Sequence, residues 1–399
     1  MNNPNTSSPG QGPRRTGALQ RVADERGAVL AMVTLGLIVF LGLAALAIDL
    51  GLLYVARGEA QRAADAAAHA GASYFMENLE ATDDEIADEA IRIGLLNAVR
   101  GEASDIQRTD VEVIRDERKV RVWAHRTAKR ENPVRTLFAG VLGMQTVDVN
   151  AMAAAQIWPA TGAQCVLPIA IPDRWCISGI GPDGPCAEYS DGLDSGETFE
   201  EGHYYVPWLH PHTEEPNEYW TGFSEENYGD PLTIKPQDPH RAIQPGWFYA
   251  FRLPGVQGGA EFRDAISGCQ TGNTAWGVGD YVDTEPGNME EPTEDGFNAL
   301  IDKYPDAYWD HQNNKPAGNP DHIAGRTRPI VVFNPENPPE QGSKPFQVAN
   351  FAAVFVEGFD SNGDIQARFV RLTGLDPSPL FDPSQGGAGT QLSVVRIVE

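Results

Sequence analysis

Ala28 to Ile48 read AVLAMVTLGLIVFLGLAALAI, 21 consecutive positions without a charged side chain. As a helix rising ~1.5 Å per residue, this segment reaches roughly 31 Å, close to the ~30 Å hydrocarbon core of a bilayer. Peptide groups in lipid must be hydrogen-bonded internally, and only a helix lets one segment do so alone. The segment therefore predicts a single transmembrane helix.

The residues before this segment indicate its orientation. Arg14, Arg15, Arg21 and Arg26 lie upstream, and Asn, Ser, Pro and Gly dominate the first twelve positions. Basic residues collect in short cytoplasmic segments. We therefore expect a disordered cytoplasmic tail over residues 1–26, an anchor helix over 27–55 and an extracytoplasmic remainder.

A cleaved signal peptide is the competing interpretation of the same segment. Ala45-Leu46-Ala47 has the small-x-small form of a cleavage site. Against it, the apolar run is longer than the 7–15 residues of a typical signal-peptide core. Cleavage would release a secreted or surface binding module that begins at Ile48.

Charge and proline both divide the chain. Residues 1–130 hold 16 basic and 18 acidic side chains, whereas residues 131–399 hold 14 and 38. So acidic a surface repels nucleic acid and anionic head groups, and we expect no nucleic-acid partner. No proline lies between Pro13 and Pro133, as long helices require, and 26 follow Pro133. We predict one extracytoplasmic domain over residues 56–160 and a second over 161–399.

Small residues continue the helical pattern past the anchor. They form a stripe at spacings of three and four: Ala56, Ala60, Ala63, Ala67 and Ala70, preceded by Ala47 and Gly51. Such a stripe lets a partner helix approach closely, or it packs on the protein's own β-layer. Asp49 is likewise a candidate partner contact at membrane depth, or, near Tyr54, it reaches the outer head groups.

Local signals predict the elements of the first extracytoplasmic domain. Thr82 and Glu85 form a capping box that opens a helix over Ile86–Val99, ending at Gly101, after a break near Leu79–Ala81. Apolar alternation then predicts a β-hairpin from Val111 to Ala124. A short helix from Pro133 to Leu142, closed by Gly143, precedes a strand over Val147–Ala151. The predicted order is α, α, β, β, α, β.

The N-terminal block resembles the Tad pilus-assembly TadE/G-like proteins. The resemblance rests on Arg26-Gly27, on Ala47-Ile48-Asp49-Leu50-Gly51 with Leu53-Tyr54, and on Gln61–Ala72. Cys165 with Leu167–Asp173, Pro286–Met289 and Phe351–Val356 are similar to TadG-related proteins.

The resemblance implies a non-enzymatic, membrane-anchored accessory component of Flp-type pilus assembly in the bacterial cytoplasmic membrane. Its implied partners are other pilus-assembly or pilin-like membrane proteins, with no cofactor and no small-molecule substrate. Two family features are missing. No Asp-x-Ser-x-Ser run marks a von Willebrand A domain, and the fifth residue after Gly27 is Met32 rather than the glutamate of prepilin cleavage sites.

Four cysteines, Cys165, Cys176, Cys186 and Cys269, lie beyond the anchor, where an oxidising compartment permits disulfides. Three pairings are open. The Gly- and Pro-rich loop between Cys176 and Cys186 favours joining those two, which leaves Cys165 with Cys269. No C-x-x-C is present, so zinc is disfavoured.

The best metal-like cluster is Glu201, His203, His210, His212 and Glu214. Pro207 and Pro211 break any helix there, and no H-E-x-x-H spacing occurs. An extracytoplasmic metal-dependent hydrolase therefore stays only an alternative. Asp360–Asp364 is interpreted as a hairpin turn rather than a calcium loop.

The fold class is α+β, with a β-rich distal domain. Its predicted strands are Trp247–Leu253, Ile330–Phe333, Phe346–Val356, Ile365–Leu372 and Leu392–Val398, and Thr293 is expected to cap a helix over Asp295–Lys303. The acidic insert 187–245 carries seven clustered aromatic residues: Tyr204, Tyr205, Trp208, Tyr219, Trp220, Phe223 and Tyr228. We expect them to fill a small core rather than to form a recognition face.

Overall fold

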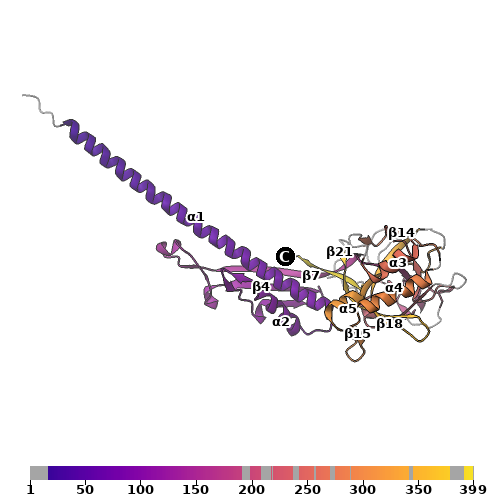
Figure 1. The fold of residues 1–399 in the computed structure, drawn as a ribbon. Helices are drawn as coiled ribbons and strands as arrows, with labels where there is room; N and C mark the ends of the chain where they lie inside the picture. Colours follow the sequence, from indigo (N-terminus) through magenta and orange to yellow (C-terminus); the bar gives the residue numbers. More distant parts are fainter. Residues whose placement is uncertain are drawn as a thin grey trace, which may run out of the picture. The chain divides into compact units, whose positions relative to one another are not determined.

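The computed structural model describes residues 17–190, 198–207, 217, 219–236, 242–255, 258–269, 275–287, 289–340, 345–377 and 391–398. It confirms the predicted α+β class: a long N-terminal helix precedes mixed helices and several sheets (Figure 1). The helices are α1 (Gly17–Glu77), α2 (Asp83–Gly94), α3 (Gly258–Ser267), α4 (Glu290–Lys303) and α5 (Pro320–Arg326).

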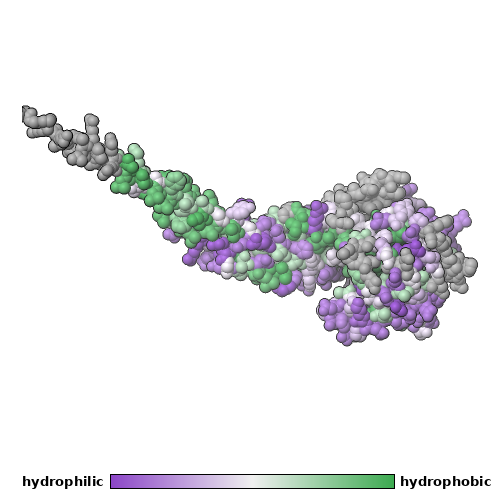
Figure 2. Space-filling view, turned by 45° about the horizontal axis from the view of Figure 1, so that its top comes forward, coloured by the Kyte–Doolittle hydropathy of each residue, from purple (hydrophilic) through white to green (hydrophobic). Residues whose placement is uncertain are grey.

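Helix α1 carries the predicted anchor. It begins at Gly17, within the range of the tail predicted over residues 1–26. Among the described residues, α1 is the one helix long and apolar enough to cross a membrane, and no residue of its most apolar part is buried. Figure 2 shows this part as a hydrophobic surface, in green. The helix ends at Glu77, next to the predicted break.

By its contacts the chain forms two compact units. One comprises Met1–Ala63, Asn97–Asp105 and Ala124–Ala151, and the other Ala64–Leu96, Ile106–Trp123 and Met152–Glu399. Each is described by itself below. The predicted domain boundaries at residues 26, 55 and 160 stay predictions.

The first unit adds two short hairpins to α1. They are β1 (Ala98–Val99) with β2 (Glu102–Ala103), and β5 (Val134–Arg135) with β6 (Thr146–Val147). The second hairpin carries the 3-10 helix η3 (Ala139–Leu142) between its strands.

Two helix predictions fail in this region. The helix predicted to reach Val99 ends at Gly94, and Arg100 and Gly101, both with positive φ, form the two-residue turn of the β1–β2 hairpin instead of a helix end. The helix predicted from Pro133 is a strand followed by η3, although Gly143 (φ 90°) does end it.

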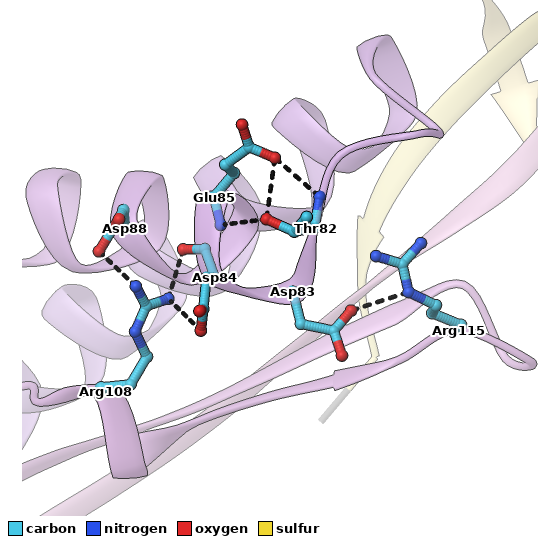
Figure 3. A network of polar contacts seen from close by, with 7 residues as sticks. All are labelled: Thr82, Asp83, Asp84, Glu85, Asp88, Arg108 and Arg115. Atoms are coloured by element: carbon cyan, nitrogen blue, oxygen red, sulfur yellow. Dashed lines mark hydrogen bonds and ion pairs between the residues drawn. The ribbon is translucent and has the colours of Figure 1, made fainter.

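In the second unit, α2 is fastened at its N-terminus. Thr82 and Glu85 form the predicted capping box, in which the Glu85 amide donates to Thr82 Oγ1 (3.3 Å) and the Thr82 amide donates to Glu85 Oε2 (2.8 Å). Two arginines near the predicted β-hairpin also contact the first two turns of α2 (Figure 3). Arg108 Nη2 lies 2.7 Å from Asp88 Oδ1, and Arg115 Nε lies 2.8 Å from Asp83 Oδ1.

Gly71 shows why α1 carries small residues here. A Cβ at this position would lie 3.0 Å from Val120 Cγ1 and 3.1 Å from Ala90 Cβ. Contacts this short require neighbours to move, so α1 approaches α2 and the sheet as closely as a glycine permits.

One seven-stranded sheet follows the order β20-β22-β7-β4-β3, with β13 and β21 also paired to β7. Its strands are β3 (Val111–Ile114), β4 (Lys119–Arg126), β7 (Val149–Ala163), β13 (Trp276–Gly277), β20 (Leu372–Thr373), β21 (Leu375–Pro377) and β22 (Leu392–Ile397). The predicted hairpin is β3 with β4, paired from Val111↔Val122 to Ile114↔Lys119.

A second seven-stranded sheet, β14-β18-β17-β8-β12-β11-β19, holds the distal core. Its strands are β8 (Leu167–Pro172), β11 (Pro231–Pro236), β12 (Trp247–Ala250), β14 (Tyr281–Asp283), β17 (Thr327–Phe333), β18 (Pro345–Phe359) and β19 (Ile365–Phe369). Two-stranded pairs are β9 (Cys176–Gly179) with β10 (Cys186–Tyr189) and β15 (Ala307–Asp310) with β16 (Lys315–Gly318).

The distal strand predictions hold in position but not in every boundary. The predicted strand from Trp247 ends at Ala250, and the one from Ile365 is split into β19 and β20. Helix α4 begins at Glu290, so Thr293 lies within its first turn and Met289 is the N-cap. The Thr293 hydroxyl instead donates to the Met289 carbonyl (2.5 Å).

Aromatic residues of the insert fill the core, as predicted. Tyr205 and Phe223 are buried in the distal core, and Tyr228 packs against it. Trp208 lies outside the described residues.

Candidate functional site

Asp49 is the buried carboxylate at the outer end of the apolar run of α1. Its side chain is 2% exposed. Oδ1 accepts the Leu137 amide (2.7 Å), and Oδ2 accepts the Phe138 amide (2.9 Å) and the Ala139 amide. Three consecutive backbone donors, 88 to 90 residues away in sequence, therefore converge on one carboxylate.

The local fold explains why these donors are free. Val134–Arg135 and Thr146–Val147 pair as a hairpin, and the chain between them closes into η3. The first amides of a helix lack intrahelical acceptors and carry partial positive charge. A carboxylate placed there satisfies them. Asp49 thus joins α1 to the loop between β5 and β6 of the same chain.

This contact belongs to neither interpretation of Asp49 made from the sequence. Both carboxylate oxygens accept backbone amides of this chain, a contact that neither interpretation predicted. A signal existed in the sequence: twelve uncharged residues, Thr136–Val147, form the loop. Nothing local connects that run to residue 49.

The small-residue stripe is divided by burial. Ala56, Ala60, Ala63 and Ala67 are completely buried within this chain. That is the arrangement expected if this part of the stripe packs on the protein's own layers. Ala47 and Gly51 are exposed, as is the nearby Tyr54 (82%), so these three positions are open to another helix.

Ala70 lies in a shallow open groove between α1 and α2. His69, Ser73 and Glu77 of α1 and Glu89 of α2 also line it. Burial raises the pKa of Glu77, and the nearby Glu89 carboxylate raises it further. The groove therefore presents two acidic side chains.

Asp173, directly after β8, is a buried carboxyl whose pKa is raised. It is 1% exposed and accepts the Tyr205 hydroxyl (2.9 Å) and the Phe223 amide (2.8 Å). Burial raises the pKa of Asp173 to about 6, although these hydrogen bonds and Arg174 lower it. A carboxyl enclosed in this way fastens the insert to the core and is closed to a substrate.

Asp173 makes stability depend on pH. Because its folded pKa, about 6, lies above the ordinary carboxyl value of 3.8, folding binds a proton between those pH values. The free energy of unfolding should therefore fall by about 3 kcal/mol as pH rises from about 4 to about 6. Asp173→Asn should remove this slope. Urea unfolding of the full chain in detergent, repeated across this pH range, measures it, and an unchanged slope would assign it elsewhere.

The metal-site alternative gains no support within the described residues. No group of three or more His, Cys, Asp or Glu side chains there is placed to hold a metal ion. His203 Nδ1 accepts the Glu200 amide (3.2 Å), whereas His210, His212 and Glu214 lie outside the described residues. Asp360 forms the predicted turn, and its Oδ1 accepts the amides of Asn362 (2.8 Å) and Asp364 (2.9 Å).

Both predicted disulfides are formed. Cys176 pairs with Cys186 between β9 and β10, and Cys165 pairs with Cys269 across 104 residues. All four cysteines are thereby used.

Two family models match the part of the chain that contains α1 and the loop bound by Asp49. Residues 27–73 match the family model "Putative Flp pilus-assembly TadE/G-like", and residues 52–155 match "Putative Tad-like Flp pilus-assembly". No curated protein and no solved structure matches the chain. The matched span contains Asp49, the small-residue stripe and the loop at 137–139.

Proposed function

Residues 27–155 belong to the Tad-like Flp pilus-assembly families, and from this premise we propose that the chain is a membrane-anchored, non-enzymatic accessory component of pilus assembly. The exposed apolar length of α1 supports the anchor. The two disulfides support an oxidising, extracytoplasmic location for the region after it. The N-terminus then lies in the cytoplasm, as the upstream arginines favour.

The proposed partners are other pilus-assembly or pilin-like membrane proteins, contacted through one face of α1. Ala47, Gly51 and Tyr54 are spaced by four and three residues, so they share a face of the helix. All three are exposed. Small residues at such spacing let a second helix approach closely in lipid.

The partner face is tested by adding bulk to it. Ala47→Leu with Gly51→Leu should strongly reduce pilus production while the protein still reaches the membrane. A Cβ at Gly51 meets no atom within 4 Å, so the change leaves the chain's own packing intact. The measurement is the quantity of sheared pili per cell.

Gly42→Leu is the matched control. It adds the same side chain nine residues earlier, half a turn around the helix from Gly51, at a position that is also open. Normal pilus production in the double variant would refute the proposed face. Loss in both variants would show only that α1 tolerates no bulk. Ala63→Leu and Ala67→Leu are unsuitable here, because both alanines are buried in this chain.

The anchored topology is tested independently by the mass and N-terminal sequence of the protein from fractionated cells, with external protease applied to spheroplasts. We expect an uncut chain in the membrane fraction that is digested from outside. A soluble product beginning at Ile48 would instead support the secreted binding module.

A further inference from the structure

The loop held by Asp49 exposes large apolar side chains. Leu137 is 64% exposed, Phe138 45%, Val141 89% and Met144 54%. We call these four residues the apolar tip. They lie in Thr136–Val147, which contains no charged residue. These four large apolar side chains lie close together in the sequence. Exposing them to water is unfavourable, and such patches commonly mark an interaction site.

The position of the apolar tip follows from Asp49. The uncharged run of α1 ends at Ile48, where a span that began at Ala28 leaves the ~30 Å hydrocarbon core. Asp49 is the next residue, and it binds the amides of Leu137 and Phe138 at 2.7 and 2.9 Å. The backbone of the tip is therefore held at the outer boundary of the hydrocarbon, beside α1.

This level coincides with the head-group region, which is about 5–8 Å thick on each side of the core. Apolar and aromatic side chains on an otherwise polar protein enter this region favourably. Tyr54, 82% exposed and farther along α1, is a residue type enriched there. Arg135, exposed at the base of the hairpin, adds a positive charge that attracts anionic head groups.

The geometry points to the apolar tip as a second membrane contact, inserted into the outer face of the same bilayer that α1 crosses. This inference rests on the proposed anchoring of α1. The occupant of the tip is lipid rather than a protein, because the tip is continuous with the lipid-facing surface of α1 at the level where that helix leaves the hydrocarbon. Two membrane contacts at one level fix the depth of α1 and its rotation about its own axis. Both must be fixed if the exposed face that contains Ala47 is to meet a partner helix.

A nitroxide label tests the depth of the tip directly. All four native cysteines are paired, so a single new cysteine is labelled selectively. The full chain with Val141→Cys is placed in vesicles of equal parts phosphatidylethanolamine and phosphatidylglycerol. Collision with oxygen, which enters lipid, is compared with collision with a nickel chelate, which stays in water. We expect an oxygen-to-nickel ratio several-fold above that of Tyr308→Cys, a 60% exposed residue on β15.

Phe40→Cys, in the middle of the apolar run and 75% exposed, separates this inference from the proposed anchor. If its label is in lipid and the Val141→Cys label behaves like that of Tyr308→Cys, the second contact is wrong and the anchor stands. If the Phe40→Cys label lies in water, the anchor itself fails. A Val141→Cys label shielded from both reagents would show that protein, in this preparation a second copy, covers the tip instead of lipid.

Discussion

Asp49→Ala should detach the loop between β5 and β6, which contains η3, from α1 and abolish pilus assembly. The substitution removes the acceptor of three backbone amides, at Leu137, Phe138 and Ala139. Buried donors left without an acceptor are unfavourable, so the loop should open to find water or lipid. Hydrogen exchange of these amides, measured by mass spectrometry on the full chain in nanodiscs, should change from protected to near the rate of an unstructured segment.

Two variants define the cause of this effect. Asp49→Asn keeps an acceptor oxygen but loses the charge, so it should give an intermediate loss of protection. Leu50→Ala changes the adjacent residue, which is 58% exposed, and should leave the loop protected. If Asp49→Ala left exchange at residues 137–139 unchanged, the carboxylate would not be what holds the loop.

Predictions from sequence succeed where the physical cause is local. The capping box of Thr82 and Glu85 needs only a four-residue segment, and the alternation of Val111–Ala124 reports a hairpin face directly. Both are found as predicted. The end of α2 was missed although its signal is local, because Gly101 was assigned to a helix end when it forms a hairpin turn with Arg100.

The contacts that define the candidate site are nonlocal. Asp49 meets amides 88 to 90 residues away, and Asp173 meets Tyr205 and Phe223 across 32 and 50 residues. Periodicity assigns a side chain to a face, but it does not say which distant loop covers that face. The stripe predicted from the sequence grouped Ala47 with Ala63, yet at about 100° per residue the two lie about 160° apart around α1, so helical periodicity already separates the exposed Ala47 from the buried Ala63.

Removing the Cys165–Cys269 disulfide should cost more stability than any single hydrogen bond in the chain. This bond closes 104 residues and joins the turn between β7 and β8 to the segment after α3. By the loop-entropy model, such a link destabilises the unfolded chain by about 5 kcal/mol, against about 3 kcal/mol for the ten-residue separation of Cys176 and Cys186. The paired substitutions Cys165→Ala with Cys269→Ala should therefore lower the urea midpoint further than Cys176→Ala with Cys186→Ala.

Tryptophan fluorescence of the full chain in detergent reports the unfolding, because Trp175, Trp247 and Trp309 are buried. The short-loop pair is the matched control, since both variants lose one disulfide and two sulfurs. Equal midpoints for the two variants would show that loop length does not determine how much each disulfide stabilises the fold. The proposed anchor, α1, contains neither bond, so the two variants should remain membrane-bound. A defect in pilus assembly confined to the long-loop variant would trace to its distal fold.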